Sequence, residues 1–170
     1  MKPALLVIDI QQAYFKESPV AAESLTNVIG IINYYIGMFR KYNLPVICVR
    51  NSEPDFGFVP GSDGYDVPES LEIEESDLHI DKTYGNAFNK TPLLEKLQEL
   101  GVDTLFLTGF EAENCVLSTY RGALDLDLTP IIIRDTLASS HPENIPFVER
   151  IGSVISYAPL QKWLESLQTK

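Results

Sequence analysis

Hydrophobic and polar positions divide the chain into short apolar runs separated by longer amphipathic segments. A short continuous apolar run without alternation is typical of a strand that is buried on both faces of a sheet. Four such runs lie at residues 4–10, 44–50, 103–109 and 129–135. Two shorter runs lie at residues 77–82 and 154–156. The pattern predicts six strands.

The segments between these runs predict helices at residues 21–42, 91–101, 113–126 and 159–168. The second of these has the clearest ends, because Thr91 is placed to cap it, Pro92 takes the first helical position and Gly101 closes it. The polar stretch 51–76, which contains several prolines and glycines, predicts a long loop.

Strands that alternate with helices favour a mainly parallel sheet covered on both faces. We therefore expect an α/β fold, a three-layer doubly wound sandwich around a central, mainly parallel six-stranded sheet. No repeat, low-complexity tract or linker interrupts the pattern, so residues 1–170 are expected to form a single domain.

Composition narrows the classes of function. The formal net charge of −11 would repel nucleic acids and anionic membrane surfaces, which favours a small-molecule partner. The two cysteines, Cys48 and Cys115, lie in different predicted elements, and free thiols indicate a reducing compartment. No apolar run approaches the ~18 residues of a membrane span, and the N-terminus lacks the apolar core of a signal peptide. We expect a cytoplasmic protein.

Three chemically capable residues follow three different predicted strands. Asp9 ends the first strand, Lys82 ends the third, and Cys115 comes just after the fourth. Taken singly, each has an ordinary interpretation: a turn cap, a solvated charge and a packed thiol. Ligands of doubly wound sheets bind beyond the carboxyl ends of the strands, however, and the fold would bring all three residues to that edge.

Together these residue types suit nucleophilic catalysis. An ammonium group and a helix N-terminus both favour a thiolate, so Lys82 and the start of helix 113–126 would activate Cys115. Asp9 could act as the general base, first for the thiol and then for the water that cleaves a thioester. Backbone N–H groups at the helix start could bind a developing oxyanion.

Four segments carry a resemblance to a known family: LLVIDIQQAYF (5–15), FVPGSDGYDVPESL (58–71), DLHIDKTYGNAF (77–88) and GFEAENCVLSTYRGALDLDLTPIIIRDTLAS (109–139). The chain resembles the isochorismatase-like cysteine hydrolases, which include nicotinamidases, N-carbamoylsarcosine amidohydrolases and isochorismatases. The resemblance covers nearly the whole chain and implies the Rossmann-like isochorismatase fold, with Asp9, Lys82 and Cys115 as the catalytic triad. It also implies a cis peptide bond at Phe110-Glu111, with the backbone N–H groups of Glu111 and Cys115 in the oxyanion site.

One departure from the family concerns metal binding. Nicotinamidases bind a metal through an Asp-x-His pair and further histidines after the second strand, but the corresponding VRNSEPDFGFVPG has no histidine. His79 and His141 lie elsewhere and make no ligand cluster. We therefore expect neither a metal nor another cofactor. The chain also lacks a G-x-G-x-x-G motif after the first strand and a P-loop, which argues against a nucleotide-binding domain.

The residues around the Asp and Lys motifs are candidates for the substrate pocket. Gln11 lies in the first-strand motif, and Tyr14, Phe15 and Phe88 could form an apolar wall. Packing in the core is the alternative for the aromatic residues.

The first helix, residues 21–42, is apolar on more faces than one sheet can cover. This predicts a homo-oligomer, with cover by the loop 51–76 as the alternative.

The preferred function is a metal-free cysteine hydrolase that cleaves a C–N bond of a small amide-like substrate. The alternatives are a vinyl-ether hydrolase of the isochorismatase type and a catalytically idle binding or redox-sensing protein.

Overall fold

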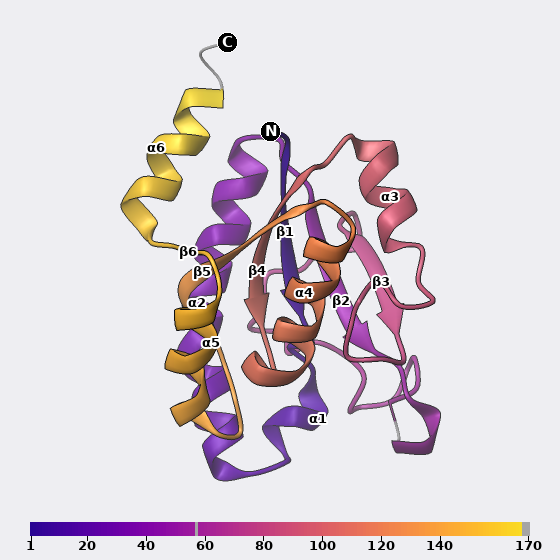
Figure 1. Cartoon of the computed structure of the whole chain (residues 1–170). Helices are drawn as coiled ribbons and strands as arrows, with labels where there is room; N and C mark the ends of the chain where they lie inside the picture. Colours follow the sequence, from indigo (N-terminus) through magenta and orange to yellow (C-terminus); the bar gives the residue numbers. More distant parts are fainter. Residues whose placement is uncertain (57, 168–170) are drawn as a thin grey trace.

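Six strands form one sheet in the computed structural model, which describes residues 1–56 and 58–167. The order across the sheet is β3-β2-β1-β4-β5-β6, and each neighbouring pair is parallel (Figure 1). The strands are β1 (Pro3–Ile8), β2 (Val46–Asn51), β3 (Leu78–Lys82), β4 (Thr104–Gly109), β5 (Thr129–Leu137) and β6 (Val154–Ile155). The predicted α/β fold with a central six-stranded sheet is confirmed, and the sheet is parallel throughout the described residues.

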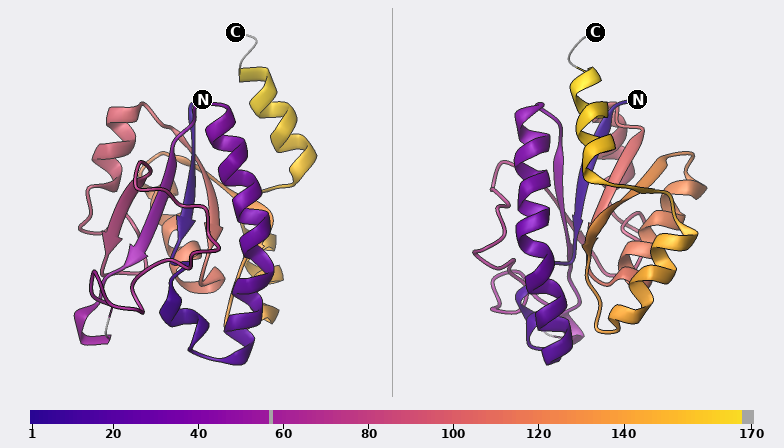
Figure 2. Two further views of the ribbon diagram at one scale, coloured as in Figure 1. Left: turned by 180° about the vertical axis from the view of Figure 1, so that it is seen from behind. Right: turned by 90° about the vertical axis from the view of Figure 1, so that its left-hand side faces the viewer.

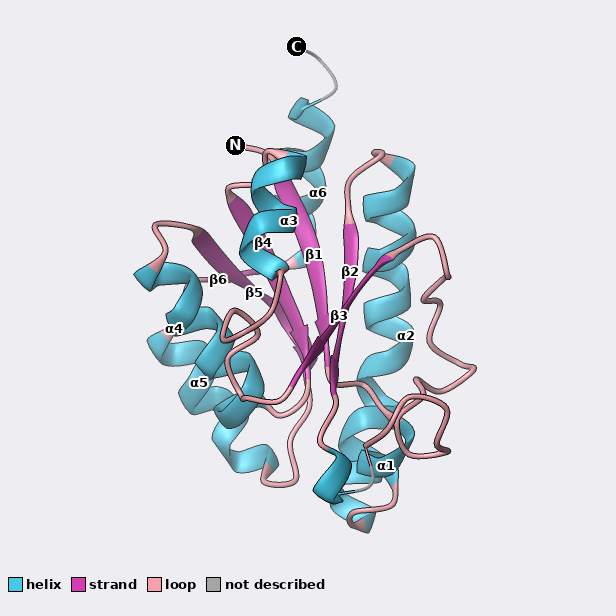
Figure 3. Cartoon of the chain, turned by 90° about the vertical axis from the view of Figure 1, so that its right-hand side faces the viewer, coloured by secondary structure: helices cyan, strands magenta, loops and turns pink. Residues whose placement is uncertain are grey.

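The helices are α1 (Gln12–Phe15), α2 (Pro19–Lys41), α3 (Leu93–Leu100), α4 (Leu117–Asp125), α5 (Ile145–Ile151) and α6 (Tyr157–Leu167). Short 3-10 turns lie at Pro54–Phe56 and Pro142–Asn144. Helices α2 and α6 cover one face of the sheet, and α3, α4 and α5 cover the other (Figures 2 and 3). This arrangement is the predicted three-layer sandwich.

Strand β1 shows why the central strands are continuous apolar runs. Successive side chains of a strand point to opposite faces. Leu5 and Val7 pack in the core under α2 and α6, whereas Leu6 and Ile8 pack in the core under α3, α4 and α5. Both faces are covered, so no position of β1 calls for a polar residue.

The helix ends differ slightly from the predicted ones. Helix α2 begins earlier than predicted because the Ser18 side chain accepts a hydrogen bond from the backbone N–H of Ala21 and Pro19 takes the first helical position. Helix α3 begins at Leu93, with Pro92 as its capping position. Gly101 ends α3 in the left-handed conformation, as predicted.

The predicted helix 113–126 needs a correction. Residues Ala112–Val116 form a single π-helical turn, and the α-helix begins only at Leu117. Cys115 therefore lies in a widened turn, of a kind that is frequent at functional sites.

Helix α5 was not predicted at all. Pro146 lies near its start, and a proline usually argues against a helix. Proline is nevertheless tolerated in the first turn of a helix.

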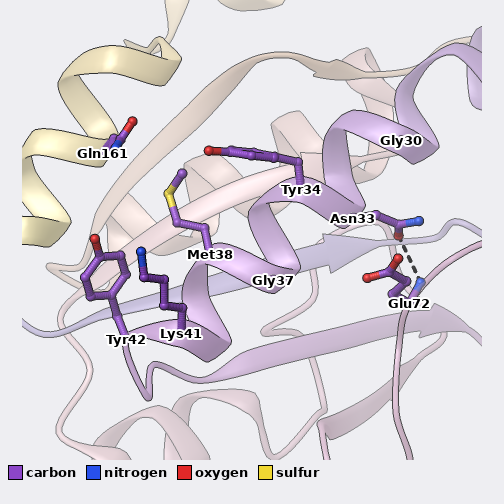
Figure 4. Close-up of a pocket in the computed structure, with 9 residues that line it drawn as sticks. All are labelled: Gly30, Asn33, Tyr34, Gly37, Met38, Lys41, Tyr42, Glu72 and Gln161. Atoms are coloured by element: carbon purple, nitrogen blue, oxygen red, sulfur yellow. Dashed lines mark hydrogen bonds between the residues drawn. The ribbon is translucent and has the colours of Figure 1, made fainter.

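One flank of α2 is covered within the chain, and another side is exposed. The end of the 51–76 loop packs along one flank, where Asn33 hydrogen-bonds to the backbone of Ser70 and Glu72. The outer side of α2 still exposes Val20, Ile31 and Tyr34. Between α2 and α6 lies a groove of about 610 Å³ (Figure 4), lined by Gly30, Asn33, Tyr34, Gly37, Met38, Lys41, Tyr42, Glu72 and Gln161.

Among the described residues, every helix is too short or too polar to cross a lipid bilayer.

Candidate active site

Asp9 occupies the topological switch point of the sheet. It follows β1, whose neighbours β2 and β4 are reached by connections that run in opposite directions along the sheet. Its backbone takes a left-handed conformation (φ 52°), which aspartate tolerates better than most residues. Its N–H donates to the carbonyl of Val49 at 2.9 Å, and its side chain is fully buried. Asp9 is thus held rigidly where such sheets bind ligands.

The structure brings the three predicted catalytic residues together. The Lys82 ammonium nitrogen lies 2.6 Å from Oδ2 of Asp9 and 3.3 Å from Sγ of Cys115. The Asp9 and Lys82 side chains are 0% and 1% exposed, and Cys115 is half-buried. Buried charges persist in proteins when they are paired. The arrangement is therefore a buried ion pair with a thiol beside it.

The backbone before Cys115 approaches β1 closely. Gly109 has φ 121°, and a Cβ at this position would overlap the backbone of Ile8. Only glycine adopts this conformation without strain. The Phe110-Glu111 peptide bond is cis, as the resemblance implies. The chain then enters the π-helical turn that carries Cys115.

The protonation of Cys115 differs from the expected thiolate. Burial, and next the negative charge of Asp9, raise the pKa of the Cys115 thiol to about 12, although Lys82 acts in the opposite direction. The thiol is therefore protonated at neutral pH. Burial also raises the pKa of Asp9 despite Lys82, which makes this carboxylate a stronger base than an ordinary aspartate. Burial lowers the pKa of Lys82, but Asp9 and Cys115 outweigh it and raise this pKa.

Of the predicted pocket residues, Gln11 is bound by backbone groups of the protein itself. Its side chain is fully buried, donates to the carbonyls of Asn51 (3.0 Å) and Tyr65 (2.8 Å), and accepts from the N–H of Asn51 (2.7 Å). Gln11 thus joins β1 to β2 and to the following loop. These bonds occupy its amide with the protein's own backbone, which gives it a structural role.

The three aromatic candidates for the substrate pocket have different surroundings. Phe15 packs against the core under α2, and Phe88 packs against the core on the other face of the sheet. Tyr14 packs against the same core as Phe15, and burial and then the charges of Asp9 and Cys115 raise the pKa of its hydroxyl. Its ring packs against Phe110, with the ring centroids 4.7 Å apart. Tyr14 is thus the aromatic candidate whose hydroxyl is influenced by the charges of the predicted triad.

Sequence reasoning missed Asn51, the last residue of β2. Asn51 is opposite Lys82 in the parallel register and is 8% exposed. Its Nδ2 donates to the Tyr14 hydroxyl at 3.2 Å, whereas its Oδ1 has no hydrogen-bond partner within the part of the chain that the structure describes. Buried polar atoms are rarely left unpaired. The sequence signal that could have identified Asn51 is its place as a polar residue at the end of a buried apolar strand, which resembles the place of Asp9.

A small cavity of about 300 Å³ opens beside the end of β3. It is lined by Glu53, Pro54, Asp55 and Thr83, the residue after Lys82. Asp9, Lys82 and Cys115 are not among the residues that line it. Within residues 1–56 and 58–167, no three His, Cys, Asp or Glu side chains are grouped in a way that could hold a metal ion.

Comparison with known proteins gives a consistent family assignment. The model of the isochorismatase domain matches residues 3–147. An uncharacterized isochorismatase family protein of Bacillus subtilis, YddQ, is 31% identical over 143 residues, which cover 82% of this chain and 79% of the relative. Maleamate amidohydrolase of Pseudomonas putida is 24% identical over 161 residues, covering 84% and 75% of the two chains.

Solved structures agree with this result. The crystal structure of N-carbamoylsarcosine amidase from Thermoplasma acidophilum superposes with a TM-score of 0.79 at 28% identity, covering 92% of this chain and 95% of that one. Because the family model spans most of the chain, this protein belongs to the isochorismatase family, a family of hydrolases.

Proposed function

We propose that this protein is a cysteine hydrolase that cleaves the C–N bond of a small amide through a thioester on Cys115. One observation carries the proposal: a single buried ammonium, Lys82, contacts both the Asp9 carboxylate (2.6 Å) and the Cys115 sulfur (3.3 Å). A nucleophile and a base that contact the same cation form an arrangement suited to covalent catalysis.

The first half-reaction would begin from the protonated thiol. As Sγ attacks the substrate carbonyl carbon, the thiol proton passes to Asp9, and Lys82 stabilises the negative charge that develops on sulfur. The backbone N–H groups of Glu111 and Cys115 hold the carbonyl oxygen as it becomes an oxyanion. The tetrahedral intermediate then collapses, the C–N bond breaks, and Asp9 returns the proton to the leaving nitrogen.

The second half-reaction would use the same base. Asp9 removes a proton from water, whose oxygen attacks the thioester carbonyl carbon. The C–S bond breaks, the acid product leaves, and the proton on Asp9 returns to Sγ. The raised pKa of Asp9 suits both steps, because each requires the carboxylate to accept a proton.

The surroundings of the triad favour a small substrate. Tyr14 supplies an aromatic wall, and Asn51 presents a buried amide beside it. Relatives named maleamate amidohydrolase and N-carbamoylsarcosine amidase support an amide as the substrate class. We propose that no metal takes part, because the segment after β2 lacks histidine.

The test is release of ammonia from a panel of small primary amides that includes maleamate, nicotinamide and N-carbamoylsarcosine. The wild type should release ammonia from at least one of them, also in the presence of a chelator, and acid quenching should trap an acyl group on Cys115 that mass spectrometry detects. Cys115→Ser and Asp9→Asn should abolish the release. Equal activity of Cys115→Ser would contradict a thiol nucleophile.

The two alternatives predict different results. A vinyl-ether hydrolase needs no thiol nucleophile and would keep its activity in Cys115→Ser. A redox sensor requires a thiolate at rest, and the raised pKa of Cys115 argues against that role.

A further inference from the structure

Two carboxylates next to Cys115 bind the loop that follows β5. Glu111 accepts hydrogen bonds from the backbone N–H of Ser140 (3.0 Å) and from the side chain of Asn114. Glu113 accepts from the Ser139 hydroxyl (2.8 and 2.9 Å to its two oxygens) and from Nδ2 of Asn144 (2.6 Å). Every donor is a neutral group, and hydrogen bonds to an ionised acceptor are the stronger kind.

The loop that these carboxylates bind is itself firmly attached. Ser139 is fully buried, and its N–H donates to the Ser24 hydroxyl of α2 at 3.0 Å. Its own hydroxyl also accepts from the N–H of His141 at 2.8 Å. The N–H of Ala138 donates to the carbonyl of Gly109, and the Ala138 carbonyl accepts from the N–H of Ala112. The loop is therefore fixed to α2 and to the end of β4.

Glu111 and Glu113 stand four and two residues before Cys115. Glu111 precedes the π-helical turn, and Glu113 and Cys115 lie within it, in a type of turn that is frequent at functional sites. The hydrogen bonds of the two carboxylates therefore attach the segment that carries the sulfur to the loop 138–144.

We propose that Glu111 and Glu113 are positioning residues that clamp the Cys115 turn to the loop 138–144, and so hold the sulfur against Asp9 and Lys82. This inference rests on the proposed cysteine mechanism but assigns a role to two carboxylate side chains that do not touch the reacting atoms. A displacement of about 1 Å can cost roughly 100-fold in rate, so the loss of a carboxylate should affect catalysis more than binding.

Glu113→Ala and Glu113→Gln test the clamp on the amide that the wild type hydrolyses best. The alanine variant should lose about 10- to 100-fold in kcat with KM changed only a few-fold, because a misplaced nucleophile slows the chemical step. The glutamine variant keeps an acceptor oxygen for Ser139 and Asn144 and should recover most of the activity. The control is Glu149→Ala, which removes a carboxylate bound to Arg134 and leaves the Cys115 turn untouched.

A second readout needs no substrate. The rate at which iodoacetamide alkylates Cys115, followed against pH by mass spectrometry, reports the surroundings of the sulfur. The pH midpoint of Cys115 alkylation in Glu113→Ala should differ from that of the wild type. The midpoint in Glu149→Ala should equal that of the wild type. Should Glu113→Ala fail to fold, Ser139→Ala and Asn144→Ala remove the donors one at a time.

The clamp would be refuted if Glu113→Ala lost thermal stability but kept the wild-type kcat and alkylation midpoint. It would also be refuted if Glu113→Gln were as impaired as Glu113→Ala, because charge rather than geometry would then matter. A wild type that releases no ammonia from any amide refutes the proposed function instead, and the alkylation midpoints still decide the clamp.

Discussion

The ammonium nitrogen of Lys82 lies 3.3 Å from the sulfur of Cys115, yet the pKa of that thiol is raised to about 12. Burial is the largest cause, and the second is the charge of Asp9, which also pairs with Lys82 at 2.6 Å. The site therefore keeps its proton on sulfur at rest. In the proposed mechanism, Asp9 removes that proton only when a carbonyl carbon is in place to be attacked.

Asp9→Asn should make Cys115 more reactive toward iodoacetamide while abolishing amide hydrolysis. Removing the negative charge removes a cause that raises the thiol pKa and leaves Lys82 free to stabilise the thiolate, so the alkylation midpoint should move to lower pH. Lys82→Met should move it to higher pH for the opposite reason. The measurement is the alkylation rate from neutral to alkaline pH.

Peptide mass spectrometry must separate Cys115 from Cys48, whose pKa burial also raises to about 12, and Cys115→Ser is the control. Slower alkylation of Cys115 in Asp9→Asn than in the wild type would contradict the assigned balance of charges.

The buried ion pair makes single substitutions costly. Lys82→Met leaves the Asp9 charge without its partner, and breaking a buried pair costs about 3–5 kcal/mol of unfolding free energy. The double variant Asp9→Asn/Lys82→Met removes both charges and should be less destabilised than the sum of the two single variants. Urea unfolding of the four proteins measures this coupling. Strict additivity would show that the two charges do not interact.

Gln11→Leu should destabilise the fold. It leaves the N–H of Asn51 and the carbonyl of Tyr65 without their partners, and an unsatisfied buried group costs about 1–3 kcal/mol. The control is Gln161→Leu on the surface of α6, where only a hydrogen bond to Glu165 is lost. If Gln11→Leu kept wild-type stability and raised only KM, the interpretation of Gln11 as a substrate-binding residue would be restored.

Gly109→Ala should prevent folding or cost several kcal/mol, because its φ of 121° and the adjacent Ile8 backbone exclude a Cβ. Gly37→Ala is the matched control. A Cβ there meets nothing within 4 Å, and alanine in a helix is about 0.5–1 kcal/mol more favourable than glycine. Thermal unfolding compares the two. A stable Gly109→Ala would show that the β1–β4 contact can relax.

The outer face of α2 should mediate a homo-oligomer. Ile31 and Tyr34 are 37% and 50% exposed, and the hydroxyl of Tyr34 bonds to that of Tyr157, 2.9 Å away on α6. We predict a mass of at least twice the monomer by light scattering, reduced to the monomer in Ile31→Glu. Glu23→Gln, on the same helix, should leave the mass unchanged. A monomeric wild type would leave the loop 51–76 as the main cover of α2.

The local sequence determined which segments form strands and where the catalytic candidates lie. The buried run of β1 and the left-handed closure of α3 at Gly101 depend on near neighbours, so they could be predicted. Asp9, Lys82 and Cys115 could be proposed together because parallel strands bring their carboxyl ends to one edge. The family motifs supported the same three residues.

Only the tertiary structure decided how these residues interact. The pKa of Cys115 depends on its burial and on the charge of Asp9, which lies 106 residues away in the chain. The role of Gln11 follows from backbone groups of β2 and the following loop, and the clamp joins Glu113 to a loop beyond β5. Desolvation and long-range hydrogen bonds arise only when distant segments pack together, so no local pattern of residues reports them.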